Sequence, residues 1–187
     1  MLALSSSNQK RLLSLAFESL LSQFEGLGLP SFKSSDPELC QESGCFVTLH
    51  QKGQLRGCIG TFERQGPLYE KVPRMARAAA FQDLRFEHVS KKEVAELTLD
   101  ISVLGEMKEI SNLEEIEIGR HGVYVACDGK TGTLLPEVAV EHGMSREQFV
   151  LCCAQEKAGL KPEQIGRARL FIYEVFKFSG TLHDCKG

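Results

Sequence analysis

The sequence lacks a long hydrophobic run. No apolar stretch approaches the roughly 18 residues that a transmembrane helix needs. The N-terminal residues MLALSSSNQ have no basic region, and their apolar run is too short for the hydrophobic part of a secretory signal. We therefore expect a cytoplasmic protein with no membrane partner.

Paired cysteine motifs are also absent. The seven cysteines are an odd number and include no CxxC pair, which favours reduced, free thiols. Two runs of potential ligands occur, at His183-Asp184-Cys185 and at Cys152-Cys153. Because neighbouring residues seldom point at one ion, neither run predicts a metal site.

Motifs for common cofactors and nucleophiles are missing as well. The sequence has neither a GxxxxGK[ST] nor a GxGxxG loop to cradle phosphates, and no GxSxG elbow to present a serine. No cofactor is predicted.

The net charge of the whole chain is small, but positive charge is concentrated in one segment. The 187 residues carry a formal net charge of −3, which gives no general reason to expect nucleic acid as a partner. Residues 52–92, however, hold nine basic groups against four acidic groups and are net +5, whereas the remainder is −8. An anionic partner would meet this basic segment.

Hydrophobic periodicity predicts both helices and strands. Helical spacing covers residues 8–24, a segment that starts at Pro67, and another from Ser145 to near Gly159. Strand patterns cover CFVTLH, LRGCIG, LTLDISVL, VYVAC, GTLLP and RLFIYEVFKF.

The connections between these elements indicate the fold class. Lys52-Gly53 and Asp128-Gly129 predict hairpin turns, and hairpins outnumber βαβ signals. We therefore predict an α+β fold, with a mainly antiparallel sheet covered by about three helices. The prediction is one domain over residues 1–187, with a weak boundary between two intertwined lobes near 105–120.

The segment LRGCIG, residues 55–60, is the first candidate for chemistry. On a regular strand, Arg56 and Cys58 project from the same face, and an adjacent Arg lowers the pKa of a thiol. Cys58 is therefore a candidate nucleophile. Gly57 and Gly60 would let a ligand or another backbone approach closely. The alternative is that Cys58 is packed as a small hydrophobe and the glycines mark a bulge or tight packing.

His50 is the candidate partner for a Cys-His pair, and the hairpin register decides its position. With a two-residue turn at Lys52-Gly53, His50 pairs with Leu55 and points away from Cys58. A one-residue bulge would bring His50 onto the face of Arg56 and Cys58.

Cations on the second helix form another candidate site. Lys71, Arg74 and Arg77 follow at intervals of three, and Arg85 lies just beyond the helix. They form either a solvated face or an anion site for phosphate or carboxylate, which Arg binds bidentately. Asp83 is expected to hold Arg85 or Arg56 in place.

Six segments carry a resemblance to a known family: GCFVTLHQKGQLRGCIGTFE, ARAAAFQDLRFEHVS, LDISVL, IEIGRHGVYV, GTLLPEVAVEHGMSREQF and QEKAGL. In this order they resemble the AMMECR-type domain family, protein A of the AmmeMemoRadiSam system. The resemblance runs from about residue 8 to 178, and LRGCIG is its hallmark. Small departures occur at Pro73 and at Leu84, where the family often has proline.

The resemblance implies a fold with a larger and a smaller lobe, and association with a Memo-like protein and a radical SAM protein. It transfers no settled reaction. The positions that it carries over are the hallmark Leu55–Gly60 together with Arg77, Asp83, Arg85 and Phe86.

Three function hypotheses follow. The first is a component of a modification pathway that binds an anionic substrate or partner at the LRGCIG strand, with Cys58 as nucleophile and contacts from Arg56, Gly57, Gly60, His50, Arg77, Asp83 and Arg85. The second is a non-enzymatic adaptor in which Cys58 is structural. The third, RNA or nucleotide binding through residues 52–92, is disfavoured because aromatic residues are sparse there.

Overall fold

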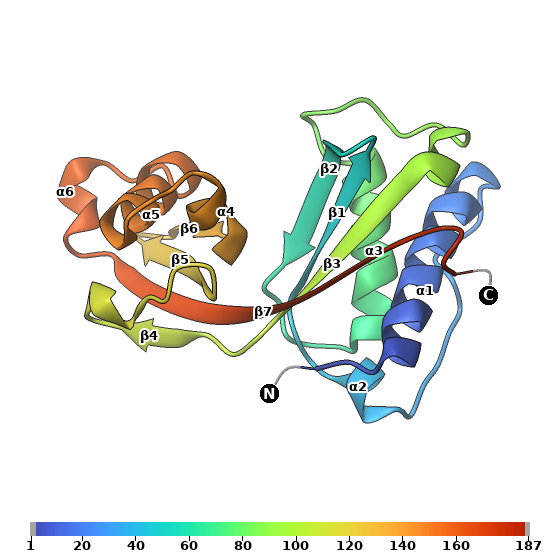
Figure 1. Cartoon of the computed structure of the whole chain (residues 1–187), viewed down its shortest axis with the longest axis horizontal. Coiled ribbons are helices and arrows are strands. Elements are labelled where there is room, and N and C mark those ends of the chain that lie inside the picture. The colour runs from blue at the N-terminus through green and yellow to red at the C-terminus, as the bar shows by residue number, and fades with distance from the viewer. Residues whose placement is uncertain (1–2, 186–187) are drawn as a thin grey trace. The chain divides into compact units, whose positions relative to one another are not determined.

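The computed structural model describes residues 3–185, which form two compact units (Figure 1). Unit 1 contains the residues up to Leu104 and those from Phe176 onward, and unit 2 is Gly105–Val175. The strand β7, Arg169–Thr181, contributes residues to both units. The predicted α+β class is confirmed. The structure has more helices than the three expected, and several of them are only one or two turns long.

Unit 1 is built on a sheet with the strand order β2-β1-β3-β7, in which β1 pairs antiparallel with both of its neighbours. Besides β7, its strands are β1 Cys45–Gln51, β2 Gln54–Thr61 and β3 Leu97–Leu104. Its helices are α1 Ser6–Phe24, α2 Pro37–Cys40, α3 Leu68–Phe81 and the 3₁₀ turn η1 Glu93–Glu96.

One face of this sheet forms the core of unit 1. Val47 and Leu49 of β1 and Leu99 and Ile101 of β3 are fully buried, and they belong to one cluster with Phe17 of α1 and other residues of α1 and α3. The alternation of LTLDISVL predicts a strand with one buried face; its apolar residues are buried as predicted, but Asp100 and Ser102 on the opposite face are buried as well. The polar alternate residues of the same strands therefore lie on the opposite face.

Local signals position the first hairpin and the first helix. Lys52 and Gly53 form the predicted hairpin turn between β1 and β2, and both have positive φ, 52° and 78°, as a type I′ turn requires. The helix α1 begins slightly earlier than expected, because the side chain of Ser5 caps it by accepting from the Asn8 N–H.

Unit 2 has the strand order β4-β7-β5-β6, and all of its pairs are antiparallel. Its strands are β4 Lys108–Ile110, β5 His121–Cys127 and β6 Lys130–Leu134 with the first half of β7, and its helices are η2 Leu113–Glu115, α4 Pro136–Glu141, α5 Arg146–Cys152, the π-helix Cys153–Lys157 and α6 Pro162–Ile165.

A separate hydrophobic cluster stabilises unit 2. Val123 of β5, Phe149 of α5 and Ile172 of β7 belong to it. The predicted helix after Ser145 is present with its capping box, but it continues as a π-helix before Gly159 ends it with φ of 61°. Within residues 3–185, no helix is long and apolar enough to cross a bilayer.

The close contact between β2 and α3 depends on one glycine. A Cβ atom at Gly57 would overlap the backbone carbonyl of Ala79 in α3. The carbonyl belongs to the helix backbone and cannot rotate away, so only a residue without a side chain fits this approach. Gly57 therefore sets the distance between the strand and the helix.

We expect Gly57→Ala to lower the free energy of unfolding by about 1–3 kcal/mol, because the strand and the helix must separate. Urea denaturation measures this change. Gly166→Ala is the matched control, since a Cβ there has no atom within 4 Å and φ is not positive. Equal effects at the two positions would show that the Gly57 contact does not limit packing.

Candidate functional site

An extra residue in β2 determines which side chains lie near Cys58. Leu49 pairs with Gly57 and His50 pairs with Leu55, so Arg56 has no partner and the ladder contains a bulge. Beyond the bulge, Thr48 pairs with Cys58. Cross-strand partners share a face, and His50 lies two residues from Thr48, so His50 and Cys58 lie on the same face.

A band of polar side chains crosses unit 1 on this face. Thr48 lies between Cys58 on β2 and Asp100 on β3 in the strand register. The Asp100 carboxylate accepts a hydrogen bond from Ser179 Oγ at 2.6 Å and pairs with Lys177 Nζ at 3.0 Å, both from β7. We call this band the polar row; its members are Thr48, His50, Cys58, Asp100, Lys177 and Ser179.

The Cys58 thiol is partly covered rather than freely exposed. Its Sγ lies 3.2 Å from Thr48 Oγ1, and either atom can donate in this contact. Burial raises the pKa of the Cys58 thiol, and this effect exceeds the lowering by the Thr48 hydrogen bond and by the charges of Arg85 and Lys177. The thiol is therefore protonated at neutral pH, contrary to the lowered pKa that the sequence suggested.

Arg56 does not form the expected pair with Cys58. Its Nε is 3.0 Å from Glu93 Oε1, and its Nη1 and Nη2 donate to the carbonyls of Glu87 and His88. The bulge breaks the alternation that would place Arg56 beside the thiol. Arg56 instead fastens β2 to the segment that follows α3.

At both glycines of the motif, other atoms of the protein occupy the space that a side chain would need. Gly57 faces the backbone of Ala79, and a Cβ at Gly60 would overlap the ring of Phe46. That ring also makes an edge-on contact with Phe62, with centroids 5.5 Å apart. The glycines therefore serve packing, the alternative that the sequence left open.

Asp83 and Arg85 cover the outer edge of β2 at Cys58. The Cys58 N–H donates to Asp83 Oδ2 at 2.9 Å, and Arg85 Nη2 lies 3.5 Å from the Cys58 carbonyl oxygen. Arg85 also binds the Asp83 carboxylate through Nε at 2.9 Å and Nη2 at 2.6 Å. Hydrogen bonds from Arg85 are the main cause of the strongly lowered pKa of Asp83. The pair thus satisfies the backbone of an edge strand.

The cations of α3 do not gather into one anion site. Arg77 donates to the carbonyls of Ser19 and Gly28, which holds the C-terminal end of α1 and the loop after it. Lys71 is only 2% exposed and donates to the carbonyls of Ser43 and Arg64. Both side chains support the fold, and we do not assign them to a ligand.

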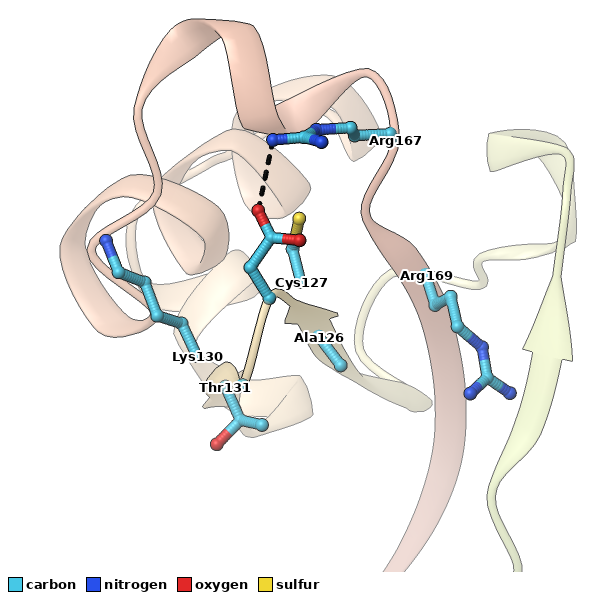
Figure 2. A pocket seen from close by; sticks show the side chains of 8 residues that line it. Ala126, Cys127, Lys130, Thr131, Arg167 and Arg169 are labelled. Atoms are coloured by element: carbon cyan, nitrogen blue, oxygen red, sulfur yellow. Dashed lines mark hydrogen bonds and ion pairs between the residues drawn. The ribbon is translucent and has the colours of Figure 1, made fainter.

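A cavity of about 300 Å³ lies in unit 2 at the β5–β6 turn (Figure 2). Its cations have separate partners: Arg167 pairs with Asp128 at 3.1 Å, Arg169 pairs with Glu109 at 2.8 Å, and Lys130 donates to a backbone carbonyl. Figure 2 shows the side chains of Arg167 and Arg169 extending in different directions. The positive groups do not converge, so the polar row is the stronger candidate.

The sequence patterns missed most of the polar row. Thr48, Asp100, Lys177 and Ser179 were not among the predicted site residues. The alternation of LTLDISVL did place Asp100 opposite the core, but the pattern contains nothing on its neighbours in β1 and β7. Among residues 3–185, no group of three His, Cys, Asp or Glu is arranged to hold a metal ion.

The family model described as AMMECR1 matches residues 13–178, which is most of the chain. The chain belongs to the AMMECR1 family. This assignment agrees with the LRGCIG motif, which supplies the bulge, the two packing glycines and Cys58.

Relatives and a solved structure support the same assignment. A protein of Sulfolobus acidocaldarius is 33% identical over 93% of this chain and 80% of its own length. A protein of Methanopyrus kandleri is 40% identical over 70% of this chain and 67% of its own length. The crystal structure of the uncharacterized protein PH0010 from Pyrococcus horikoshii superposes with a TM-score of 0.82 at 30% identity, covering 90% of this chain and 89% of that one.

The Asp83–Arg85 pair at the outer edge of β2 predicts that stability depends on pH. The pKa of Asp83 is lowered in the fold, so its carboxylate contributes stability above the ordinary value of 3.8 and loses this contribution as the pH falls below it. We expect Asp83→Asn to cost about 1–3 kcal/mol at pH 7, with the difference from wild type shrinking near pH 3. Urea denaturation at both pH values measures it. Glu63→Gln, which breaks an exposed pair with Arg74, should change stability little, and a similar cost there would refute the assignment.

The Cys58 environment predicts slow alkylation at neutral pH. Burial raises the pKa of the thiol above its ordinary value of 9.0, so the inflection of the iodoacetamide rate should lie above pH 9. Peptide mass spectrometry resolves Cys58 from the other thiols. Half-buried Cys152 serves as the comparison within the same chain. An inflection at a lower pH than that of a free thiol would instead support an activated thiolate at Cys58.

Proposed function

We propose that this protein is a component of a modification pathway and acts with a Memo-like protein and a radical SAM protein. Family membership supports this proposal, since the AMMECR-type resemblance implies both associations. In our proposal the polar row of unit 1 holds a substrate or a partner segment, and Cys58 is the reactive group. Within LRGCIG, Cys58 is the residue whose side chain joins the other polar groups of this face.

Two cations make an anionic group the preferred occupant. The side chains of Arg85 and Lys177 are 57% and 41% exposed, and both charges act on the Cys58 thiol. Each is paired with a carboxylate, Asp83 or Asp100. A carboxylate or phosphate placed over the thiol would interact with both cations. The proposal keeps Arg85, His50 and Cys58 as contacts and assigns Arg56, Arg77, Gly57, Gly60 and Asp83 to the architecture.

A non-enzymatic adaptor is the second candidate. The raised pKa of Cys58 favours it, because a protonated thiol is a poor nucleophile without further help. In this case the same face is a binding surface and Cys58 contributes only contact area.

Nucleic-acid binding has less support. Three of the four aromatic rings of the basic segment make edge-on contacts with other rings: Phe62 with Phe46, Tyr69 with Phe32, and Phe81 with Phe24. A ring in such a contact has less of its surface free for a stacked base.

Partner capture with Cys58→Ser separates the two candidates. Full-length wild type and variant are used to capture the purified Memo-like protein, and the products are analysed with and without reductant. If Cys58 is reactive, a covalent product with the partner or its substrate should form with wild type and be lost in Cys58→Ser. Cys152→Ser, in unit 2, is the control and should behave like wild type.

The adaptor predicts a different result. Capture by Cys58→Ser should then equal that by wild type, and no covalent product should appear with either. Absence of capture by both would refute the pathway association itself.

A further inference from the structure

The side chains of His50 and Asp100 lie close together on the face that carries Cys58. His50 Nδ1 lies 3.7 Å from Asp100 Oδ2, and the side chains are 29% and 12% exposed. The carboxylate is fixed from the other side, since Ser179 Oγ donates to Oδ1 at 2.6 Å and Lys177 Nζ lies 3.0 Å from Oδ2. Asp100 is therefore held by two partners, and its carboxylate lies beside the imidazole.

The bulge places this imidazole on the same face of the sheet as the thiol. Thr48 is directly opposite Cys58, and His50 is the next residue of β1 on the same face. Diagonal neighbours in an antiparallel pair are about 7–8 Å apart at Cα, a distance that long side chains span. Because Nδ1 faces Asp100, Nε2 is the nitrogen that can accept a proton from the Cys58 side.

A buried thiol needs such a base in order to react. Burial keeps the thiol protonated at neutral pH, and the charges acting on it are Arg85, Asp83 and Lys177. None of these three is an effective base at neutral pH, because the strongly lowered pKa of Asp83 makes its carboxylate a weak base and the other two are cations. An oriented imidazole supplies the missing base and contributes typically 10²–10⁴-fold in rate.

We propose that Cys58, His50 and Asp100 act as nucleophile, general base and positioning residue in accepting an acyl group from an activated ester or thioester. The proposal rests on the proposed function, in which Cys58 is the reactive group. Sγ forms a bond to the acyl carbonyl carbon as its proton moves to His50 Nε2. The bond from that carbon to the leaving oxygen or sulfur then breaks, and the leaving group takes the proton from the imidazolium. The product is a thioester on Cys58, with no change in oxidation state.

The test is acylation of the full chain by p-nitrophenyl acetate across a range of pH. Release of p-nitrophenolate gives the rate, and peptide mass spectrometry locates the acetyl group. Wild type should acylate Cys58 at neutral pH, well below the inflection of its alkylation by iodoacetamide. Cys58→Ser should lose this acetylation.

Removing the base and removing the positioning residue should slow acylation to different extents. His50→Ala should slow acylation at neutral pH by about 10²-fold, and Asp100→Asn should slow it by about tenfold. Both should alkylate Cys58 at the wild-type rate above the thiol pKa, where no base is needed. A purely structural effect would change both reactions. His142→Ala, an exposed histidine of unit 2, is the control and should match wild type.

Two outcomes would overturn the inference. One is acylation at wild-type rates in His50→Ala and Asp100→Asn, which would leave Cys58 reactive but without this base. The other is a wild-type acylation profile that simply follows ionisation of the thiol. The capture experiment with the Memo-like protein judges the proposed function independently of either result. If Asp100→Asn does not fold, Ser179→Ala replaces it, since it removes one of the bonds that fix the carboxylate.

Discussion

The bulge at Arg56 is the constraint on which the organisation of unit 1 depends. One additional residue in β2 sends Arg56 toward Glu93, seats Gly57 against the backbone of α3 and places Cys58 opposite Thr48. The same shift puts His50 on the face of the thiol. Without the bulge the hairpin would have the register in which His50 points away, and the polar row would lose its imidazole. A backbone irregularity thus decides both the packing and the chemistry available to the motif.

The basic segment acts mostly within the protein. Arg77, Lys71 and Arg56 donate to backbone carbonyls of loops and helix ends, and Arg85 is bound by Asp83. These bonds satisfy polar groups that would otherwise be costly to bury. The positive charge of residues 52–92 therefore reflects how loops are tied to helices more than it reflects attraction of a distant anion. At Cys58, the charges of Arg85 and Lys177 act on a thiol that is only partly buried.

The sequence predicted those features of this fold that depend on local patterns. Alternation in LTLDISVL identified the buried face of β3, and Lys52-Gly53 identified the first turn. The conformation of the bulge and the burial of Cys58 depend on contacts with α3 and with the segment after it, which lie outside any local window. Arg56 and Cys58 are only two positions apart in the sequence, but this proximity was misleading. The charged groups that act on the thiol are those of Asp83, Arg85 and Lys177.

The residues of LRGCIG can be separated by the physical demand on each. Gly57 and Gly60 are required by neighbouring atoms that occupy the place of a side chain, and Ile59 packs against the core. Arg56 fills the bulge and binds carbonyls. Packing and polar satisfaction explain all four without invoking a ligand. They do not explain a thiol placed against Thr48 in a row that also contains a fixed carboxylate and an imidazole. A small apolar residue would fill the Cys58 position without leaving a sulfur beside a hydroxyl, so the position is where a functional demand on the motif is to be sought.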